Sequence, residues 1–305
     1  MASAHALTRP EQNKLLGILL RLGAASAFGV MAAMLKLAAD EGVAATEMLF
    51  YRAAFGLPVV VLWLMLGPGF GAVRTRRPLA HLGRSALGIA SILCTFKALT
   101  LLPLADATTV GFSAPIFATI LSALILREAV GRHRWTAVVV GFVGILVVMR
   151  PGGEGIPHLG LAIALVSALG TAAVTITVRQ LGGTENAAGI VFWFFVCSMI
   201  VGAVLLLFTG QTHGAEALLY LIGGGVAGGV AQLLMTASLR FAPVSVIAPF
   251  DYTQLIWAVL FGWLFWSAQP SLATWAGAAI IVASGLYTVY REQVRRRGKP
   301  ATEML

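Results

Sequence analysis

The chain has 305 residues, of which 59% are hydrophobic and 11% are charged, and its mean hydropathy is +0.89. A water-soluble domain carries charged residues at roughly 25% of its positions, so most of this chain's surface faces something other than water. The net charge of +9 does not indicate a nucleic-acid surface, because the cations lie in short loops and a tail rather than along one polar face. The composition excludes a soluble protein and favours an integral membrane protein.

Apolar segments follow one another from end to end, and most reach the roughly 18 residues that a bilayer core requires. The loops between them are short and often carry Pro or Gly. Alternating segments of about ten residues, which are typical of a membrane barrel, do not occur. The sequence predicts an all-α integral membrane fold with ten transmembrane helices. The expected spans are 15–38, 46–66, 81–101, 104–126, 132–149, 158–179, 188–209, 216–239, 243–266 and 271–290.

Cationic residues set the expected orientation in the membrane, since Lys and Arg favour cytoplasmic loops. With the N-terminus placed inside, most of the 21 cations fall on the cytoplasmic side, and shifting the count by one helix would destroy this bias. We expect a multi-pass protein of the bacterial inner membrane with both termini in the cytoplasm. Residues 291–305 would form a basic cytoplasmic tail.

Ionisable groups within a span cost about 2.5 to 3.5 kcal/mol on insertion scales, so each needs a reason. Lys36 lies near the outer end of the first span, and we expect its ammonium to reach the interface. Arg52 lies one turn inside the second span and follows Glu47 by five residues. A structural ion pair between Arg52 and Glu47 is the favoured interpretation there.

Lys97 is the most informative cation of the third span. It shares a helix face with the small residues Gly83, Ala86, Ala90 and Cys94, at spacings of 3 and 4. Small residues mark faces that pack on other helices or border cavities, so the lysine is expected to point inward. It would then contact an anionic group on a substrate, while a snorkelling lysine near the outer interface is the alternative.

The fourth span carries a polar stripe of Asp106, Thr109 and Ser113. Asp106 falls in the first turn, where a carboxylate suits the helix dipole. Capping is the leading interpretation of this stripe, and contact with a ligand is the second.

Later spans add further candidates. Trp193 belongs to an aromatic cluster of the seventh span, where most members would be lipid-facing or interfacial and one or two would line a cavity. The pairs Gly224/Gly228 and Gly225/Gly229 indicate close helix packing in the eighth span.

Asp251 lies deeper in the ninth span than a helix cap would, with Gln254 on the same face and Tyr252 beside it. Asp251 is expected to bind a substrate amine, pair with a basic side chain or exchange a proton.

An internal repeat relates the two halves of the chain. Segment 98–148 aligns with 238–288 at a constant offset of 140, which matches Pro103 with Pro243 and Phe112 with Tyr252. Five spans separate the copies, and because five is odd the halves would be inverted relative to each other. Inverted repeats with a binding site near the midplane are typical of secondary transporters.

Several stretches carry a resemblance to a known family. Ala98–Thr108, Ala114-Pro115 and Arg127-Glu128 resemble the first half of the EamA family of the drug/metabolite transporter superfamily, and Pro249–Gln254 with Gly277–Tyr287 resembles the second half. The resemblance implies a single membrane domain over 1–305 with five-helix repeats at 15–149 and 158–290, a central cavity and alternating access. The chain departs from the family at Ala268, often Glu, and at Lys97, usually aromatic.

Nothing in the motifs points to catalysis or to a cofactor. We find no HExxH, Walker A or GxSxG sequence, and neither Cys94 nor Cys197 has metal-ligand spacing. The expected function is a permease or exporter of small polar metabolites, such as amino acids, carboxylates or related compounds, working by alternating access. An integral membrane enzyme acting on lipid is the alternative, and a channel is a third hypothesis.

We expect the partners to be a small-molecule substrate, the lipid bilayer and a proton as coupling ion, with no nucleic acid and no metal, in a monomer or homodimer. The substrate-binding candidates are Lys97, Asp251, Gln254, Tyr252, Asp106, Ser113, Trp193, Lys36 and Arg52.

Overall fold

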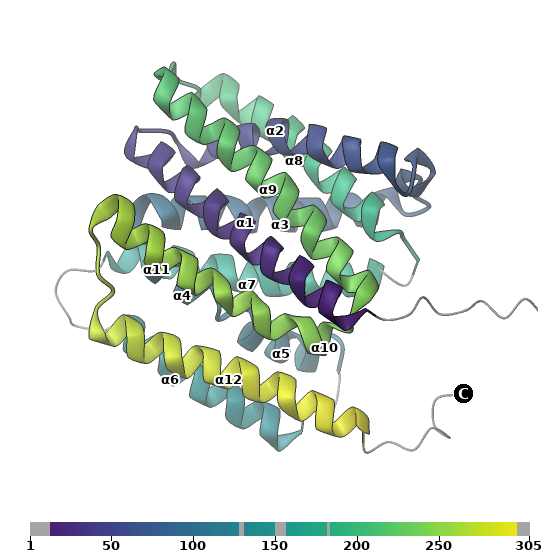
Figure 1. Ribbon diagram of the computed structural model, residues 1–305, viewed down its shortest axis with the longest axis vertical. Helices are drawn as coiled ribbons and strands as arrows, with labels where there is room; N and C mark the ends of the chain where they lie inside the picture. Colours follow the sequence, from purple (N-terminus) through teal and green to yellow (C-terminus); the bar gives the residue numbers. More distant parts are fainter. Residues whose placement is uncertain (1–12, 128–130, 150–156, 182–183, 298–305) are drawn as a thin grey trace, which may run out of the picture.

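The computed structural model describes residues 13–127, 131–149, 157–181 and 184–297, and every regular element in these ranges is a helix (Figure 1). In chain order they are α1 (Lys14–Asp40), α2 (Ala45–Leu66), the 3-10 helix η1 (Phe70–Val73), α3 (Pro78–Leu101), α4 (Leu104–Gly111), α5 (Ala114–Ile125), α6 (Arg132–Met149), α7 (His158–Leu181), α8 (Ala187–Thr209), α9 (Ala215–Phe241), α10 (Val244–Ile247), the 3-10 helix η2 (Ala248–Tyr252), α11 (Thr253–Trp266) and α12 (Leu272–Arg297).

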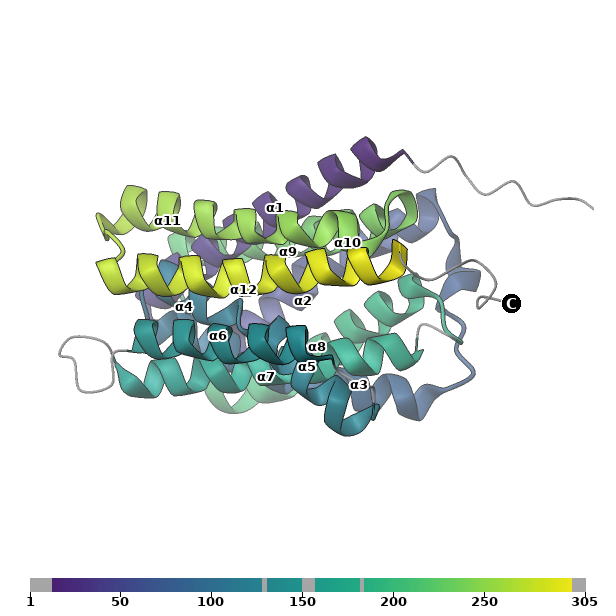
Figure 2. The same cartoon turned by 90° about the horizontal axis from the view of Figure 1, so that it is seen from below.

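Within the described ranges, nine helical stretches are long and apolar enough to cross a bilayer, one of them formed by α4 and α5 together. The tenth crossing is made by α10, η2 and α11 in series. The first turn of α1 and the last turn of α12 lie at the same end of the bundle, which we call the terminal end (Figures 1 and 2). The predicted all-α fold with ten transmembrane helices is confirmed.

Helix packing follows the expected inversion of the repeats. Helix α1 lies along α9, and its counterpart α7 lies along α3; α2 packs on α8, and α6 packs on α12 (Figure 1). Each helix has an equivalent in the other repeat, as α1 has α7 and α3 has α9. Exchanging every helix for its equivalent reproduces this set of neighbours. The two five-helix repeats therefore interlock, and most of the large helix contacts join one repeat to the other.

Two of the predicted spans are not continuous helices, because 104–126 breaks after Gly111 and 243–266 is divided by η2. The breaks correspond at the offset of 140. Ser113 Oγ donates to the Val110 carbonyl at 2.7 Å, and Thr253 Oγ1 donates to the Phe250 carbonyl at the same distance.

The residues that directly precede Ser113 and Thr253 contact each other. Phe112 contacts Tyr252, its counterpart in the other repeat, with the ring centroids 4.9 Å apart. Prolines at the starts of α5 and η2 favour the interruption. The paired breaks therefore face each other where the two repeats meet.

Glycines let α9 approach two neighbours at once. Gly224 and Gly228 face α1, whereas Gly225 and Gly229 face α2. A Cβ added to Gly225 would lie 2.7 Å from Phe55 Cβ and 2.9 Å from the Tyr51 carbonyl oxygen. Such close contacts between helices are possible only without a side chain. One glycine pair therefore packs against α1 and the other packs against α2.

We therefore expect Gly225→Ala to lower the melting temperature of the purified protein, since the added methyl group forces α2 and α9 apart. Gly83→Ala on α3 is the matched control, because a Cβ there meets no described atom within 4 Å. Alanine is favoured over glycine within a helix by about 0.5–1 kcal/mol, so the control should match or exceed the parent. Equal melting temperatures for the two variants would contradict this assignment of the glycines.

Candidate functional site

A cavity of about 240 Å³ lies inside the bundle between α1, α3, α4, α7 and α11. Most of its wall is apolar, with Phe28, Met31 and Phe112 among the larger side chains. Its polar groups come from Thr95, Thr108, Ser167, Thr171 and Gln254. A small number of polar groups in an apolar wall is typical of a site for a small molecule.

Hydroxyl groups join α3 to α7 along one side of this cavity. Ser91 Oγ donates to the Ser167 carbonyl at 2.9 Å and shares a hydrogen bond of 3.0 Å with Thr171 Oγ1. Thr95 Oγ1 and Ser167 Oγ share another at 2.5 Å. We call Ser91, Thr95, Ser167 and Thr171 the hydroxyl seam. The sequence prediction missed these residues, although Ser91/Thr95 and Ser167/Thr171 each place two hydroxyls on one helix face.

Gln254 is the sequence-predicted candidate that lines the cavity directly. It lies in the first turn of α11, just after the helix break, and its side-chain amide has no hydrogen-bond partner among the described residues. Tyr252 does not line the cavity itself, but its ring packs on Phe112, which does. The amide is therefore available to a bound solute.

Asp251 pairs with Arg21 of α1 across the two repeats. Arg21 Nε donates to Asp251 Oδ1 and Nη2 donates to Oδ2, both at 2.5 Å. The side chains are 11% and 29% exposed. Of the roles expected for Asp251, pairing with a basic side chain is the one in place, and Arg21 supplies that side chain. A two-bond guanidinium–carboxylate pair fixes both charge and geometry.

Lys97 lies outside the cavity. The small residues that share its face, including Gly83, Ala86 and Ala90, are exposed, as Lys97 itself is. The prediction that this face turns inward is wrong, because α3 borders the cavity with the opposite side, which carries Thr95 and Leu99. The small residues on this side of α3 lie on an exposed surface rather than on a packed one.

Lys36 turns into the bundle rather than out to the interface. Its Nζ donates to the Leu99 carbonyl at 3.0 Å and lies 3.9 Å from Asp40 and 5.7 Å from the centre of the Trp266 ring. Leu99 belongs to the last turn of α3, where carbonyl oxygens lack partners within the helix. The lysine therefore caps α3 at the end of the bundle opposite the terminal end, and the expectation of snorkelling is wrong.

Arg52 and Glu47 do not form the predicted ion pair. Glu47 is 1% exposed and accepts hydrogen bonds from His213, from the Gln211 N–H and from the Ala44 N–H. Residues five apart on a helix point about 140° away from each other, which explains why the two side chains diverge. The His213 side chain is 5% exposed.

The Arg52 side chain lies between helices beside a second buried arginine, Arg84 of α3. Their exposed fractions are 3% and 8%, and their guanidinium carbons lie 5.8 Å and 4.1 Å from the centre of the Phe194 ring. In both arginines Nε and Nη1 are buried without a hydrogen-bond partner among the described residues. Burying a charge costs several kcal/mol, and a cation over an aromatic ring recovers about 0.5–2 kcal/mol. The described residues therefore do not offset the full cost of burying the two arginine charges.

Asp106 and Ser113 make their hydrogen bonds away from the cavity. Asp106 Oδ1 accepts a hydrogen bond of 2.7 Å from Thr274 of α12, and both residues are buried. Ser113 bonds to the Val110 carbonyl at the break between α4 and α5. Neither residue borders the cavity.

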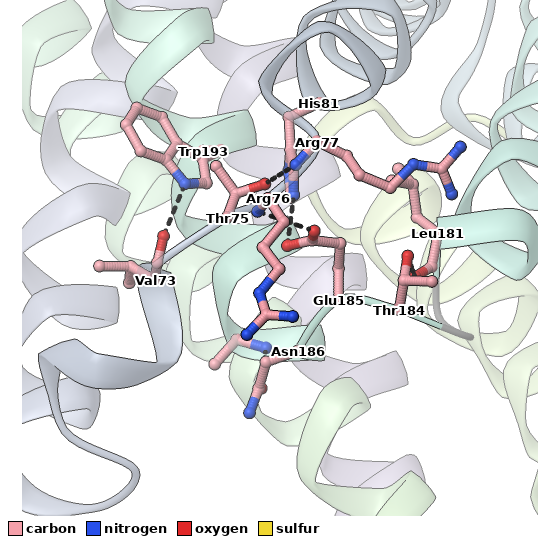
Figure 3. A network of polar contacts seen from close by, with 11 residues as sticks. Val73, Thr75, Arg76, Arg77, His81, Leu181, Thr184, Glu185, Asn186 and Trp193 are labelled. Carbon is pink, nitrogen blue, oxygen red and sulfur yellow. Dashed lines mark hydrogen bonds and ion pairs between the residues drawn. The ribbon is translucent and has the colours of Figure 1, made fainter.

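Trp193 lies near the terminal end, in a network that joins two loops (Figure 3). Its indole N–H donates to the Val73 carbonyl at 2.9 Å. Next to it, His81 and Glu185 approach to 3.2 Å, and Glu185 also accepts from the Arg76 N–H (Figure 3). Trp193 therefore ties the α2–α3 loop to α8 and takes no part in the cavity. His81 is 3% exposed.

Glu185 has a shifted pKa. Burial acts to raise the pKa of this carboxyl group. The hydrogen bonds from His81, the Arg76 N–H and Thr75, together with the charge interaction with His81, outweigh burial and hold the pKa below its ordinary value. The carboxylate therefore stays ionised at neutral pH and keeps its contacts with the α2–α3 loop.

A bundle of two inverted repeats, with a cavity at paired helix breaks, has the architecture of a membrane carrier. The sequence pattern of the EamA-like transporter family matches residues 15–150 and 158–290. The chain belongs to this family.

Individual relatives agree with this assignment. A riboflavin transporter of Rhizobium johnstonii is 32% identical over 235 residues, covering 76% of this chain and 77% of the relative. The pseudopaline exporter CntI of Pseudomonas aeruginosa is 30% identical over 271 residues, covering 88% of this chain and 94% of the relative. A solved crystal structure with 18% sequence identity shares the fold, with a TM-score of 0.66 over 93% of this chain and 99% of its own.

The Arg21–Asp251 pair generates a prediction about stability. We expect Arg21→Gln and Asp251→Asn each to lower the free energy of unfolding by roughly 1.5–3 kcal/mol, because each leaves a partly buried charge without its partner. The double variant should lose less than the sum of the two, since no unpaired charge remains. Thermal unfolding of the four proteins in detergent measures this coupling, and strictly additive losses would show that the pair does not act as a unit.

Proposed function

We propose that this protein is a secondary active transporter that moves small polar metabolites, such as amino acids, carboxylates or related compounds, by alternating access. The observation that carries the proposal is the cavity at the point where the broken helices of both repeats meet. Irregular backbone at membrane depth is tolerated only where it is buried in protein or lines a cavity. A binding site accounts for why both repeats keep such a break.

Contacts between the two repeats lie toward both ends of the bundle, and we propose that they act as its gates. Toward the terminal end lie the Arg21–Asp251 pair and the His81–Glu185 contact. Toward the opposite end, Trp266 Nε1 donates to Asp40, and His213 binds Glu47 near the Thr46–Thr209 hydroxyl pair. A carrier must release one of these sets while it keeps the other, so that the solute reaches one side at a time.

The cavity wall supports a small polar solute. Five polar side chains in an otherwise apolar space suit a solute with a few hydrogen-bonding groups. The relatives named above act on riboflavin and on pseudopaline, two different small molecules, which supports a small-molecule substrate without choosing one. We propose that the driving force for transport is the concentration gradient of the solute itself or of protons.

Solute counterflow in liposomes tests transport. Thermal stabilisation against a metabolite panel first identifies a ligand, and saturable exchange of labelled for unlabelled ligand is then expected. Gln254→Ala should weaken the apparent affinity about 3- to 10-fold, the effect of one lost hydrogen bond. Thr136→Ala, at an exposed hydroxyl of α6 away from the cavity, should leave it unchanged.

Ohmic conductance would identify a channel instead, and chemical turnover of lipid without solute exchange would identify a membrane enzyme. Repeating the exchange with and without an imposed pH gradient separates the two proposed drives, because only coupled transport accumulates solute against its own gradient.

We also propose that the terminal end faces the cytoplasm in a bacterial inner membrane, on the evidence of the cationic loops. A cysteine introduced by Glu303→Cys in a Cys94→Ala, Cys197→Ala background should react with a membrane-impermeant thiol reagent in inside-out vesicles. It should be protected in right-side-out vesicles. The reverse pattern would place both ends of the chain outside.

A further inference from the structure

We infer that Arg52 and Arg84 bind a carboxylate group of the transported solute. This inference rests on the proposed transport function and specifies the substrate class for it. It starts from two guanidinium groups that flank one phenylalanine, Phe194, inside the bundle.

Both arginines carry N–H donors that are buried and unused. Nε and Nη1 of each have no hydrogen-bond partner among the described residues, and the side chains are more than nine-tenths buried. Buried polar groups are paired in nearly all proteins, and an exception calls for an explanation such as a missing ligand. Four orphaned donors around one ring call for an acceptor that carries several lone pairs.

No carboxylate within the described ranges forms an ion pair with this cluster. Glu47, on the same helix as Arg52, is taken up by His213 and by two backbone N–H groups. Asp251 is held by Arg21, and Glu185 is held by His81. An anion from outside the chain is therefore the group that satisfies both the hydrogen bonds and the charge.

The cluster adjoins the central cavity through Met31. This side chain lines the cavity, and it meets Arg52 over Gly228, where an added Cβ would lie 2.8 Å from Met31 Sδ and 3.4 Å from Arg52 Nε. A methionine side chain is unbranched and adaptable, and we infer that a rotation of Met31 would bring Arg52 to the edge of the cavity.

Arg84 borders a second cavity, of about 420 Å³, between the terminal-end parts of α3 and α7, together with Arg77 and Gln180. The second cavity thus borders the same two helices, α3 and α7, as the central cavity, and the hydroxyl seam lies between these helices. A carboxylate held first by one arginine and then by the other would keep its charge paired while the solute changes sides.

The enclosed position favours a soluble carboxylate over the phosphate of a lipid. Arg52 is 3% exposed, and the central cavity nearby, of about 240 Å³, has no room for a molecule with two acyl chains. Arginine donors match the geometry of a carboxylate. A small organic acid is the solute that fits both the space and the charge.

Matched acids and amides test the inference on the full-length protein in detergent. The probes are glutarate against glutaramide and benzoate against benzamide, and the readout is the shift in melting temperature with concentration. The acid of at least one pair should stabilise the wild-type protein at about tenfold lower concentration than its amide. Arg52→Met and Arg84→Met should abolish this difference, whereas Arg74→Met, in an exposed loop, should keep it.

The same variants give a second readout without any ligand. Replacing an uncompensated buried charge by an apolar side chain of similar size is often stabilising, so Arg52→Met and Arg84→Met should melt at or above the wild-type temperature. A large loss of stability, or failure of both to fold, would show that the arginines are paired structurally and would overturn the inference.

Three further outcomes would overturn it. Acids and amides could stabilise equally, no acid could stabilise at all, or added phosphatidylglycerol alone could stabilise the wild-type protein but not Arg52→Met, which would assign the site to lipid. Each leaves the proposed function standing if an uncharged ligand from the panel still shows counterflow. Absence of counterflow for every ligand, with the acid preference intact, would instead reject transport and keep the anion site.

Discussion

The core of a bilayer offers no water to a polar group, so every N–H, carbonyl and charge at that depth needs a partner within the protein or a bound molecule. This requirement explains the polar contacts of the structure. Lys36 binds a carbonyl at the end of α3 that the helix cannot satisfy, and Asp251 is held by two bonds from Arg21. Where the requirement is left unmet, at Arg52 and Arg84, the molecule has reason to bind something else.

The same requirement governs the two helix breaks. A broken helix exposes backbone groups, and Ser113 and Thr253 each return a hydroxyl hydrogen to a carbonyl three residues earlier. Because these residues correspond in the two repeats, one local solution has been used twice, in opposite orientations. The rings of Phe112 and Tyr252 then pack on each other, which brings both breaks to the wall of one cavity.

The fold could be predicted from sequence because its signals are long and redundant: apolar runs, cationic loops and a constant offset between the halves. The site was harder, since most of its polar groups are neutral hydroxyls such as Thr95 and Ser167, which carry no charge to draw attention. Gln254 was found because it lies one turn from a deep carboxylate. Lys97 was misplaced because small neighbours are equally common on lipid-facing surfaces, and side-chain direction depends on helices far away in the chain.

The interlocking of the repeats also affects how the chain is made. Helix α1 has its most extensive partner in α9, and between the end of α1 at Asp40 and the start of α9 at Ala215 synthesis takes on the order of 10 s or more at the usual rates. During that interval α1 lies in the membrane without α9 to pack on, and Arg21 has not yet met its partner Asp251. Early helices must therefore be held by lipid, by the insertion machinery or by temporary neighbours until the second repeat arrives.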